Sequence, residues 1–189
     1  QALWMRNPRR MRVRFEGRLG PGVVAKDLIL NLIGRIGTAA GTGHFVEYAG
    51  SVVRGMPVEA RMTLCYMSIE FGARCGLVAP DEATFAYLRG RPLAPTGALW
   101  DEAVEAWARL PGDDDAPFDR EVEVDAAAVE PHVSWGTNPQ QVAPIGGAVP
   151  DPETLTGAAR ENARRALAYM DLRHGTRLQR IGIEMVFIG

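Results

Sequence analysis

The hydrophobic pattern of the first fifty residues predicts a strand, a helix and a second strand. Apolar and charged residues alternate over residues 11–16, which is the period of a half-buried strand. Apolar residues then recur at helical spacing over residues 26–36, and Gly37 ends that helix. A loop of small residues at 38–43 leads into a short strand at 44–48. This order of elements indicates α/β layering.

Residues 57–76 have few polar positions, so we expect one long helix that is buried on most sides. Further helices are predicted over residues 82–90, 99–110 and 158–171, and further strands over residues 120–125 and 181–188. Asp81 stands directly before one of these helices and is a typical capping residue. Residues 181–188 are mostly apolar, which is typical of a buried strand.

The pattern as a whole predicts an α/β fold in which a mixed sheet carries helices on both faces. We expect one main domain over residues 1–90. Residues 91–118 are expected to form a linker with an amphipathic helix, and residues 119–189 to begin a second α/β domain. A length of 189 residues suits one ordinary domain, or one small domain with part of another.

Six arginines between residues 6 and 18 allow two interpretations. They form either a phosphate-binding patch or the solvated face of the strand predicted at 11–16. The net charge of −2 and the pI of about 6.0 favour the solvated face. A general binder of nucleic acid or of anionic membranes is usually more basic.

The composition indicates a folded protein of a reducing compartment. Hydrophobic residues make up 47% of the chain and charged residues 23%, which excludes wholesale disorder. No apolar run approaches the roughly 20 residues that span a bilayer, and the first residues lack the apolar stretch of a signal peptide. Two cysteines do not make a disulfide framework, so we expect a cytoplasmic protein.

Few groups outside residues 57–76 suggest chemistry. The glycine-containing loop at 37–43 could cradle a phosphate, but it follows a helix instead of opening one, which is the wrong context for either nucleotide-binding motif. Cys65 and Cys75 are ten residues apart and are expected on different faces of one helix. Two thiols cannot complete a zinc or iron–sulfur site, so we interpret both as small core residues.

Glu70 is the titratable group of most interest, because we expect it inside the buried helix. A buried carboxylate either finds a partner or has a raised pKa. Arg74 follows at i+4 and would pair with it on a helix. From the residues alone, a structural ion pair and a catalytic role both remain open.

Several segments, in order along nearly the whole chain, carry a family resemblance. They are Val24-Ala25-Lys26-Asp27, Ile36-Gly37-Thr38, Gly41-Thr42-Gly43-His44, Val46-Glu47-Tyr48, Met67-Ser68-Ile69-Glu70, Gly72-Ala73-Arg74, Val78-Ala79-Pro80-Asp81-Glu82, Trp135-Gly136-Thr137-Asn138-Pro139 and Val186-Phe187-Ile188-Gly189. Together they resemble the 3-isopropylmalate dehydratase large subunits of the aconitase family. The blocks at 67–74 and 78–88 are specific to the family, whereas the glycine loop alone would be weak evidence for it.

The resemblance implies a hydro-lyase of leucine biosynthesis that dehydrates and rehydrates a hydroxy-diacid on a [4Fe-4S] cluster. One iron of the family cluster lacks a cysteine ligand and binds substrate as a Lewis acid. The resemblance also implies a small swivelling subunit as partner, which supplies a serine base. In the family, the segment matching 186–189 runs into Ser-Cys-Thr-Asn with the first cluster cysteine, and an Asp-Ser-His segment lies upstream. Both are absent from these 189 residues. We therefore expect an internal fragment that holds no cluster and is inactive alone.

By this resemblance Glu70 matches the family glutamate at the iron-bound hydroxyl, and Tyr66 and Arg74 belong to the substrate and cluster pocket. No residue of the chain is predicted to bind metal, since Cys65 matches a family cysteine that is not a ligand. Tyr66 stands where the family has asparagine, and a phenol cannot replace an amide's donors and acceptor. A related alkylmalate or homoaconitate substrate therefore stays open.

Tyr66 and Glu70 are four residues apart, so on a helix they would share a face and point into one concave surface. The competing function class is a non-catalytic binding or assembly module derived from the family.

Overall fold

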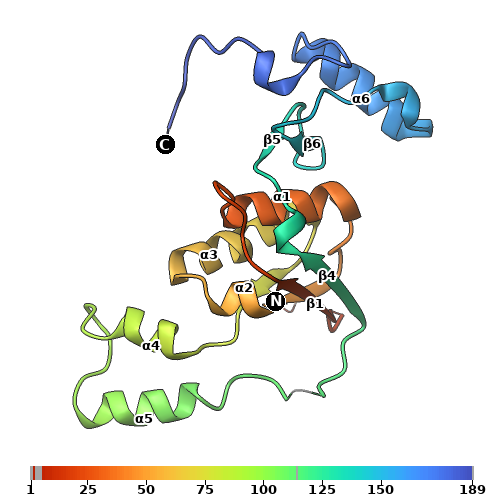
Figure 1. Ribbon diagram of the computed structural model, residues 1–189. Helices are drawn as coiled ribbons and strands as arrows, with labels where there is room; N and C mark the ends of the chain where they lie inside the picture. The colour runs from red at the N-terminus through yellow and green to blue at the C-terminus, as the bar shows by residue number, and fades with distance from the viewer. Residues whose placement is uncertain (1, 3–5, 114, 189) are drawn as a thin grey trace.

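The computed structural model describes residue 2, residues 6–113 and residues 115–188 (Figure 1). The strands are β1 (Arg9–Glu16), β2 (His44–Ala49), β3 (Cys75–Leu77), β4 (Arg120–Asp125), β5 (His132–Ser134) and β6 (Val142–Pro144). The α-helices are α1 (Ala25–Ile36), α2 (Ser51–Arg54), α3 (Val58–Met67), α4 (Glu82–Leu88), α5 (Ala98–Trp107) and α6 (Gly157–Tyr169). Short 3-10 helices are η1 (Ser68–Phe71), η2 (Ala126–Ala128), η3 (Pro152–Thr154) and η4 (Leu178–Arg180). Within these ranges no helix has the length and apolar character needed to cross a membrane.

Four strands form one parallel sheet in the order β3-β2-β1-β4. β1 pairs with β2 on one side, with Arg9 opposite His44, and with β4 on the other, with Met11 opposite Arg120. The connections from β1 to β2 and from β2 to β3 contain helices, which return the chain to the same end of the sheet. The α/β prediction is confirmed. The expected mixture of strand directions does not occur inside this sheet, and the antiparallel pair β5–β6 stands apart from it.

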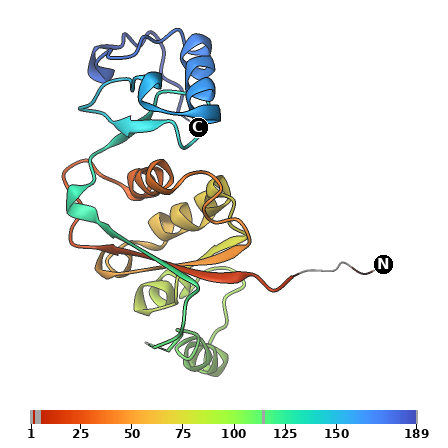
Figure 2. The same ribbon diagram turned by 90° about the vertical axis from the view of Figure 1, so that its right-hand side faces the viewer.

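The main core lies between the sheet and the helices α1 and α3, which cover one face (Figure 2). Alternation along β1 sends Met11, Val13 and Phe15 into this core, where all three are fully buried. Leu28 of α1 and Leu64 of α3 meet them from the helical layer and are also fully buried. Each such side chain stabilises the fold by about 1.5–3 kcal/mol relative to exposure.

Helices α4 and α5 lie on the other side of the sheet (Figure 2), so the prediction of helices on both faces is confirmed. They pack against each other through aromatic rings. The Trp107 ring centroid of α5 lies 6.2 Å from that of Phe85 in α4 and, within α5, 5.8 Å from that of Trp100, the latter edge-on. Such pairs contribute about 0.5–1.5 kcal/mol beyond the area that they bury.

The prediction of a single long helix over residues 57–76 is wrong. Helix α3 ends at Met67, the chain tightens into η1, and β3 begins at Cys75. Gly72 ends η1 in the left-handed region with a φ of 82°, a conformation that an α-helix cannot continue through and that glycine adopts without a steric penalty. The helix is also not buried on most sides, since only Arg61 and Leu64 of α3 are buried.

The strand at 120–125 belongs to the first sheet. Residues 119–189 are expected from sequence to begin a further domain, but β4 pairs in parallel with β1 along its whole length.

A second apolar cluster is separate from the main core and consists of Trp135, Ala143, Val149, Ala163, Ala166, Leu167 and Leu178. The buried Asp27 carboxylate of α1 connects the two parts, because it accepts from the His132 backbone N–H at 2.8 Å. The division into domains stays a prediction.

The strand expected over 181–188 is not present. After η4 these residues follow no regular structure, and Phe187 and Ile188 are 92% and 89% exposed. A strand requires a neighbouring backbone that completes its hydrogen bonds. Among the described residues no strand pairs with this segment, and apolar composition alone does not supply those bonds.

Candidate active site

The turn η1 holds Glu70 at the surface while its neighbours are buried. Ser68 and Phe71, at its two ends, are fully buried, whereas Ile69 is 70% exposed and Glu70 is also exposed. In a 3-10 helix the side chains at i and i+3 eclipse each other, so Ser68 and Phe71 both point inward. The same geometry turns Ile69 and Glu70 outward. The expectation of a buried Glu70 is therefore wrong.

The other two predicted site residues are also exposed. Tyr66 lies in the last turn of α3 with 72% of its surface accessible, and Arg74 lies in the bend before β3. The ion pair of Glu70 with Arg74 is not among those formed by the described residues. The reason is that i and i+4 meet only on a continuous helix, and the helix ends before either residue. The structural ion-pair interpretation is therefore wrong.

The small-residue loop at 37–43 supports this turn from the side. The Gly41 backbone N–H donates to the Phe71 carbonyl at 2.8 Å, and the Arg74 N–H donates to the His44 carbonyl at 2.9 Å. A Cβ atom on Gly41 of the loop would lie 2.8 Å from the Phe71 ring, and one on Gly72 would lie 2.7 Å from the Thr42 hydroxyl oxygen. Small residues therefore occur in this loop because η1 packs closely against it, which gives the loop a structural explanation without a bound phosphate.

A buried hydroxyl chain supports the turn from below. The Tyr48 phenol oxygen lies 2.7 Å from Ser68 Oγ, and Ser68 Oγ donates to the Leu64 carbonyl at 3.0 Å. Tyr48 is 1% exposed. Burial raises the pKa of the Tyr48 phenol far above its ordinary value. The phenol therefore stays protonated at any working pH.

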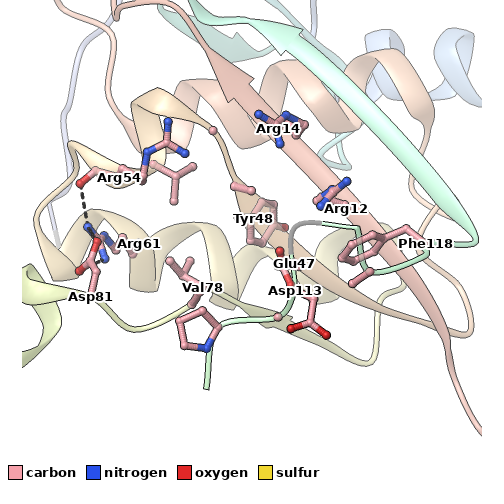
Figure 3. Close-up of a pocket in the computed structure, with 17 residues that line it drawn as sticks. Arg12, Arg14, Glu47, Tyr48, Arg54, Arg61, Val78, Asp81, Asp113 and Phe118 are labelled. Atoms are coloured by element: carbon pink, nitrogen blue, oxygen red, sulfur yellow. Dashed lines mark hydrogen bonds and ion pairs between the residues drawn. The ribbon is translucent and has the colours of Figure 1, made fainter. Parts of the chain in front are cut away.

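A concave site lies elsewhere, on the sheet face opposite α1 and α3. We call it the sheet-face hollow; its volume is about 290 Å³ (Figure 3). It is lined by Arg12, Arg14, Glu47, Tyr48, Ala49, Gly50, Val53, Arg54, Arg61, Val78, Ala79, Asp81, Pro111, Gly112, Asp113, Ala116 and Phe118. Tyr66, Glu70 and Arg74 do not line it. The single concave surface expected for Tyr66 and Glu70 therefore does not coincide with this hollow.

Most arginines of the sheet-face hollow already have carboxylate partners. Arg12 Nε lies 3.0 Å from Glu121, with its guanidinium over the Phe118 ring, and Arg14 lies 2.7 Å from Glu16. These pairs favour the solvated-face interpretation of the N-terminal arginines over a phosphate patch. Such pairing leaves little free positive charge to attract an anionic ligand.

Arg61 and Asp81 form the strongest of these pairs. Arg61 is 4% exposed, and its guanidinium donates to both Asp81 oxygens, at 2.7 and 2.8 Å. It also donates to the carbonyls of Met56 and Arg54, as the dashed line to Arg54 indicates in Figure 3. The Arg61 guanidinium lowers the pKa of Asp81. Asp81 in turn accepts from the backbone N–H groups of Ala83 and Thr84, so the predicted helix cap is confirmed.

The two thiols of the chain do not fit an iron–sulfur cluster. Gly76 of β3 faces α3, because a Cβ there would lie 2.7 Å from the Cys65 Cα. Side chains alternate along a strand, so Cys75 points to the opposite face from Cys65. Burial raises the pKa of both thiols, which disfavours the thiolate that binds metal. Among the described residues no group of three or more histidine, cysteine, aspartate or glutamate side chains could hold a metal ion.

Two interactions, one below η1 and one in the sheet-face hollow, have no local signal in the sequence. Tyr48 and Ser68 are 20 residues apart, as are Arg61 and Asp81. Asp81 is recognisable as a cap, and Arg61 as an unusual charge in an apolar helix. Their pairing depends on the way that the chain folds back between α3 and α4, which no periodicity describes.

Comparison with known proteins places the chain in a family. The model of the aconitase family (aconitate hydratase) matches residues 1–189. The chain is 51% identical over 190 aligned residues to the 3-isopropylmalate dehydratase large subunit 1 of Bradyrhizobium diazoefficiens. That match covers 100% of this chain and 40% of the relative, so the chain spans well under half of the length of that protein. Because the family model matches from the first residue to the last, the chain belongs to the aconitase family.

Proposed function

We propose that this chain is part of the large subunit of a 3-isopropylmalate dehydratase, a hydro-lyase of leucine biosynthesis, and that Glu70 is its acid–base residue. The similarity to the Bradyrhizobium large subunit supports the reaction class. The observation that carries the role of Glu70 is its position, because an exposed carboxylate stands between the buried Ser68 and Phe71 on a tightly packed turn.

The reaction needs a group that moves a proton at the substrate hydroxyl. When the hydroxyl leaves as water, its oxygen must gain a proton, and rehydration returns that proton. The Glu70 carboxyl group can donate and then accept this proton. No arginine, lysine or histidine within the described residues holds Glu70 in an ion pair, so its oxygens remain free for the substrate.

We propose that the complete protein carries a [4Fe-4S] cluster whose thiolates come from residues other than Cys65 and Cys75. The small subunit is the proposed partner that closes the site, and the predicted cytoplasmic location stays a prediction. Tyr66, two residues before η1 and strongly exposed, would face the substrate beside Glu70. Its phenol supports the alternative of a related alkylmalate or homoaconitate substrate, because it is larger than the family asparagine.

A non-catalytic binding or assembly module is the second candidate. A run of exposed apolar side chains within residues 183–188 favours it, because exposed apolar surface typically marks an interaction site. The residues are Ile183, Met185, Val186, Phe187 and Ile188. Activity separates the two candidates, since a module would show no turnover in the complete protein.

The test is Glu70→Gln in the complete large subunit, assembled with its small subunit. The substitution keeps the shape and removes the proton transfer, so kcat should fall by about 10²–10⁴-fold with an unchanged melting temperature. Glu59→Gln is the matched control, because Glu59 is an exposed carboxylate of α3. Normal turnover in Glu70→Gln would end the assignment.

A further inference from the structure

The junction between α3 and η1 contains a hydroxyl back-bond to the helix. Ser68 Oγ donates to the carbonyl of Leu64, four residues earlier, at 3.0 Å. This back-bond competes with the helical hydrogen bonds and bends helices. The Ser68 backbone N–H donates to the carbonyls of Cys65 and Tyr66 instead of that of Leu64, and the α-helix becomes a 3-10 helix at this residue.

The direction of the hydroxyl chain follows from the number of protons. Ser68 has one hydroxyl proton, which the Leu64 carbonyl accepts. Tyr48 lies 2.7 Å from Ser68 Oγ and must therefore be the donor of that bond. Because burial keeps the phenol protonated, this direction does not change with pH.

Tyr48 is a rigid donor. It lies on β2, one of the two inner strands of the sheet, and it is 1% exposed. Its ring stacks on Phe15 of β1 with centroids 6.3 Å apart and an interplanar angle of 14°. The position of Ser68 is thereby tied to the centre of the sheet and not to the surface of the molecule.

We propose that Tyr48 and Ser68 are positioning residues for Glu70, an inference that rests on the proposed function of Glu70. The chain from the Tyr48 hydroxyl through Ser68 Oγ to the Leu64 carbonyl fixes the direction in which η1 leaves α3. Glu70 follows Ser68 by two residues on this short turn, so a change of that angle moves its carboxyl group. Phe71 is buried at the other end of η1 and stays in place. A change at Ser68 would therefore rotate η1 about Phe71 instead of shifting the whole turn.

The experiment uses the complete large subunit with its small subunit and compares Ser68→Ala and Tyr48→Phe. A displacement of about 1 Å at a reacting group can cost about 10²-fold in rate. We expect kcat to fall by about tenfold to 10²-fold with little change in KM, because the lost alignment matters in the transition state. Tyr48→Phe keeps the ring and its stacking, so it remains informative if Ser68→Ala fails to fold.

Two controls separate positioning from stability. Val46→Ala lies on the same face of β2 and also removes fully buried atoms, so it should lower the melting temperature while kcat stays normal. The double variant Tyr48→Phe/Ser68→Ala leaves no unpaired hydroxyl group, so its melting temperature should recover in part relative to Ser68→Ala. Its kcat should remain low, because the Leu64 back-bond is still missing.

The Glu70→Gln background decides between the two proposals. If Ser68 acts through Glu70, Ser68→Ala should lower kcat less than twofold when Glu70 is already glutamine. An equal loss of kcat in both backgrounds, or a normal kcat in Ser68→Ala and Tyr48→Phe, overturns the positioning role and leaves the role of Glu70 intact. Normal turnover in Glu70→Gln overturns both.

Discussion

The turn η1 and the sheet-face hollow both present charge at the surface, but they use it in opposite ways. In the hollow, Arg12, Arg14 and Arg61 each contact a carboxylate within 3.0 Å. On η1, Glu70 is exposed and its neighbours Ser68 and Phe71 are held by buried contacts. The hollow is the more enclosed of the two regions, yet three of its arginines already have carboxylate partners.

Concave shape is therefore a weak guide to chemistry in this protein. A charge that already has its partner holds elements together, and removing that partner harms the fold. A charge on a well-anchored turn without a partner has its bonding capacity free for a substrate. We therefore expect substitutions in the hollow to change stability and substitutions on η1 to change activity.

The largest effect on stability should come from Asp81→Ala. It would leave the Arg61 guanidinium buried without its carboxylate and α4 without its cap. We expect a loss of about 3 kcal/mol, at the low end for breaking a buried ion pair, since two carbonyls still accept from Arg61 and Asp81 is partly exposed. The melting temperature of a chain of this length should fall by about 6–12 °C.

Glu105→Ala is the matched control for Asp81→Ala. Glu105 pairs with Arg109 at 2.9 Å on the surface of α5, with both side chains more than 70% exposed. Such a pair is worth about 0.3–0.5 kcal/mol. Equal losses of melting temperature in the two variants would remove the distinction between the hollow and the open surface.

The Arg61–Asp81 pair also predicts a pH dependence. The folded-state pKa of Asp81 lies below its ordinary value of 3.8, mainly because Arg61 donates to it. The stabilisation is therefore complete above pH 3.8 and is lost as the pH falls through the lowered pKa. Unfolding measured from pH 6 down to about pH 2 should show less acid sensitivity in Asp81→Asn than in the wild type. An identical loss of stability at low pH in both proteins would contradict the prediction.

A smaller effect is expected from Gly72→Ala, at the end of η1. Gly72 has a φ of 82°, and an added Cβ would lie 2.7 Å from the Thr42 hydroxyl. The left-handed conformation alone costs a non-glycine residue about 1–2 kcal/mol. Gly43→Ala is the control, because its φ is 75° and a Cβ there meets no atom within 4 Å.

The two glycine variants should differ in both stability and activity. Gly72→Ala should lower the melting temperature more than Gly43→Ala, and in the complete enzyme it alone should lower kcat, since it shifts the turn that carries Glu70. Circular dichroism melts and steady-state rates on both variants check this. Equal kcat values would show that the packing of η1 on the loop does not matter for the site.

The smallest effect on stability is expected from Tyr66→Asn. Because Tyr66 is 72% exposed, the free energy of unfolding should change by no more than about 0.5 kcal/mol. The substitution restores the family's usual residue, so in the complete enzyme it should raise activity or broaden the range of hydroxy-diacids accepted. Rates on a panel of such acids measure this. A large loss of stability would place Tyr66 among the structural residues instead.

Local patterns predicted the elements whose partners are close in the sequence. The alternation in β1, the helical spacing of α1 and the cap at Asp81 all appear in the structure, because each depends on residues within a few positions. The strand at 120–125 also formed, although its place beside β1 was not expected. Residues 181–188 show the limit, since an apolar run becomes a strand only beside another strand.

The candidate site shows the same division. Residue identity and order were sufficient to predict the α/β class and the family, whereas the role of Glu70 stays a prediction. Only the tertiary structure decided that Glu70 is exposed, that Arg74 is not its partner, and that Tyr48 and Ser68 meet. Three features end the helical run: the Ser68 back-bond, the left-handed Gly72 and the pairing of β3 with β2. Gly72 packs against Thr42 and β3 pairs with β2, so these two depend on parts of the chain that are distant in sequence.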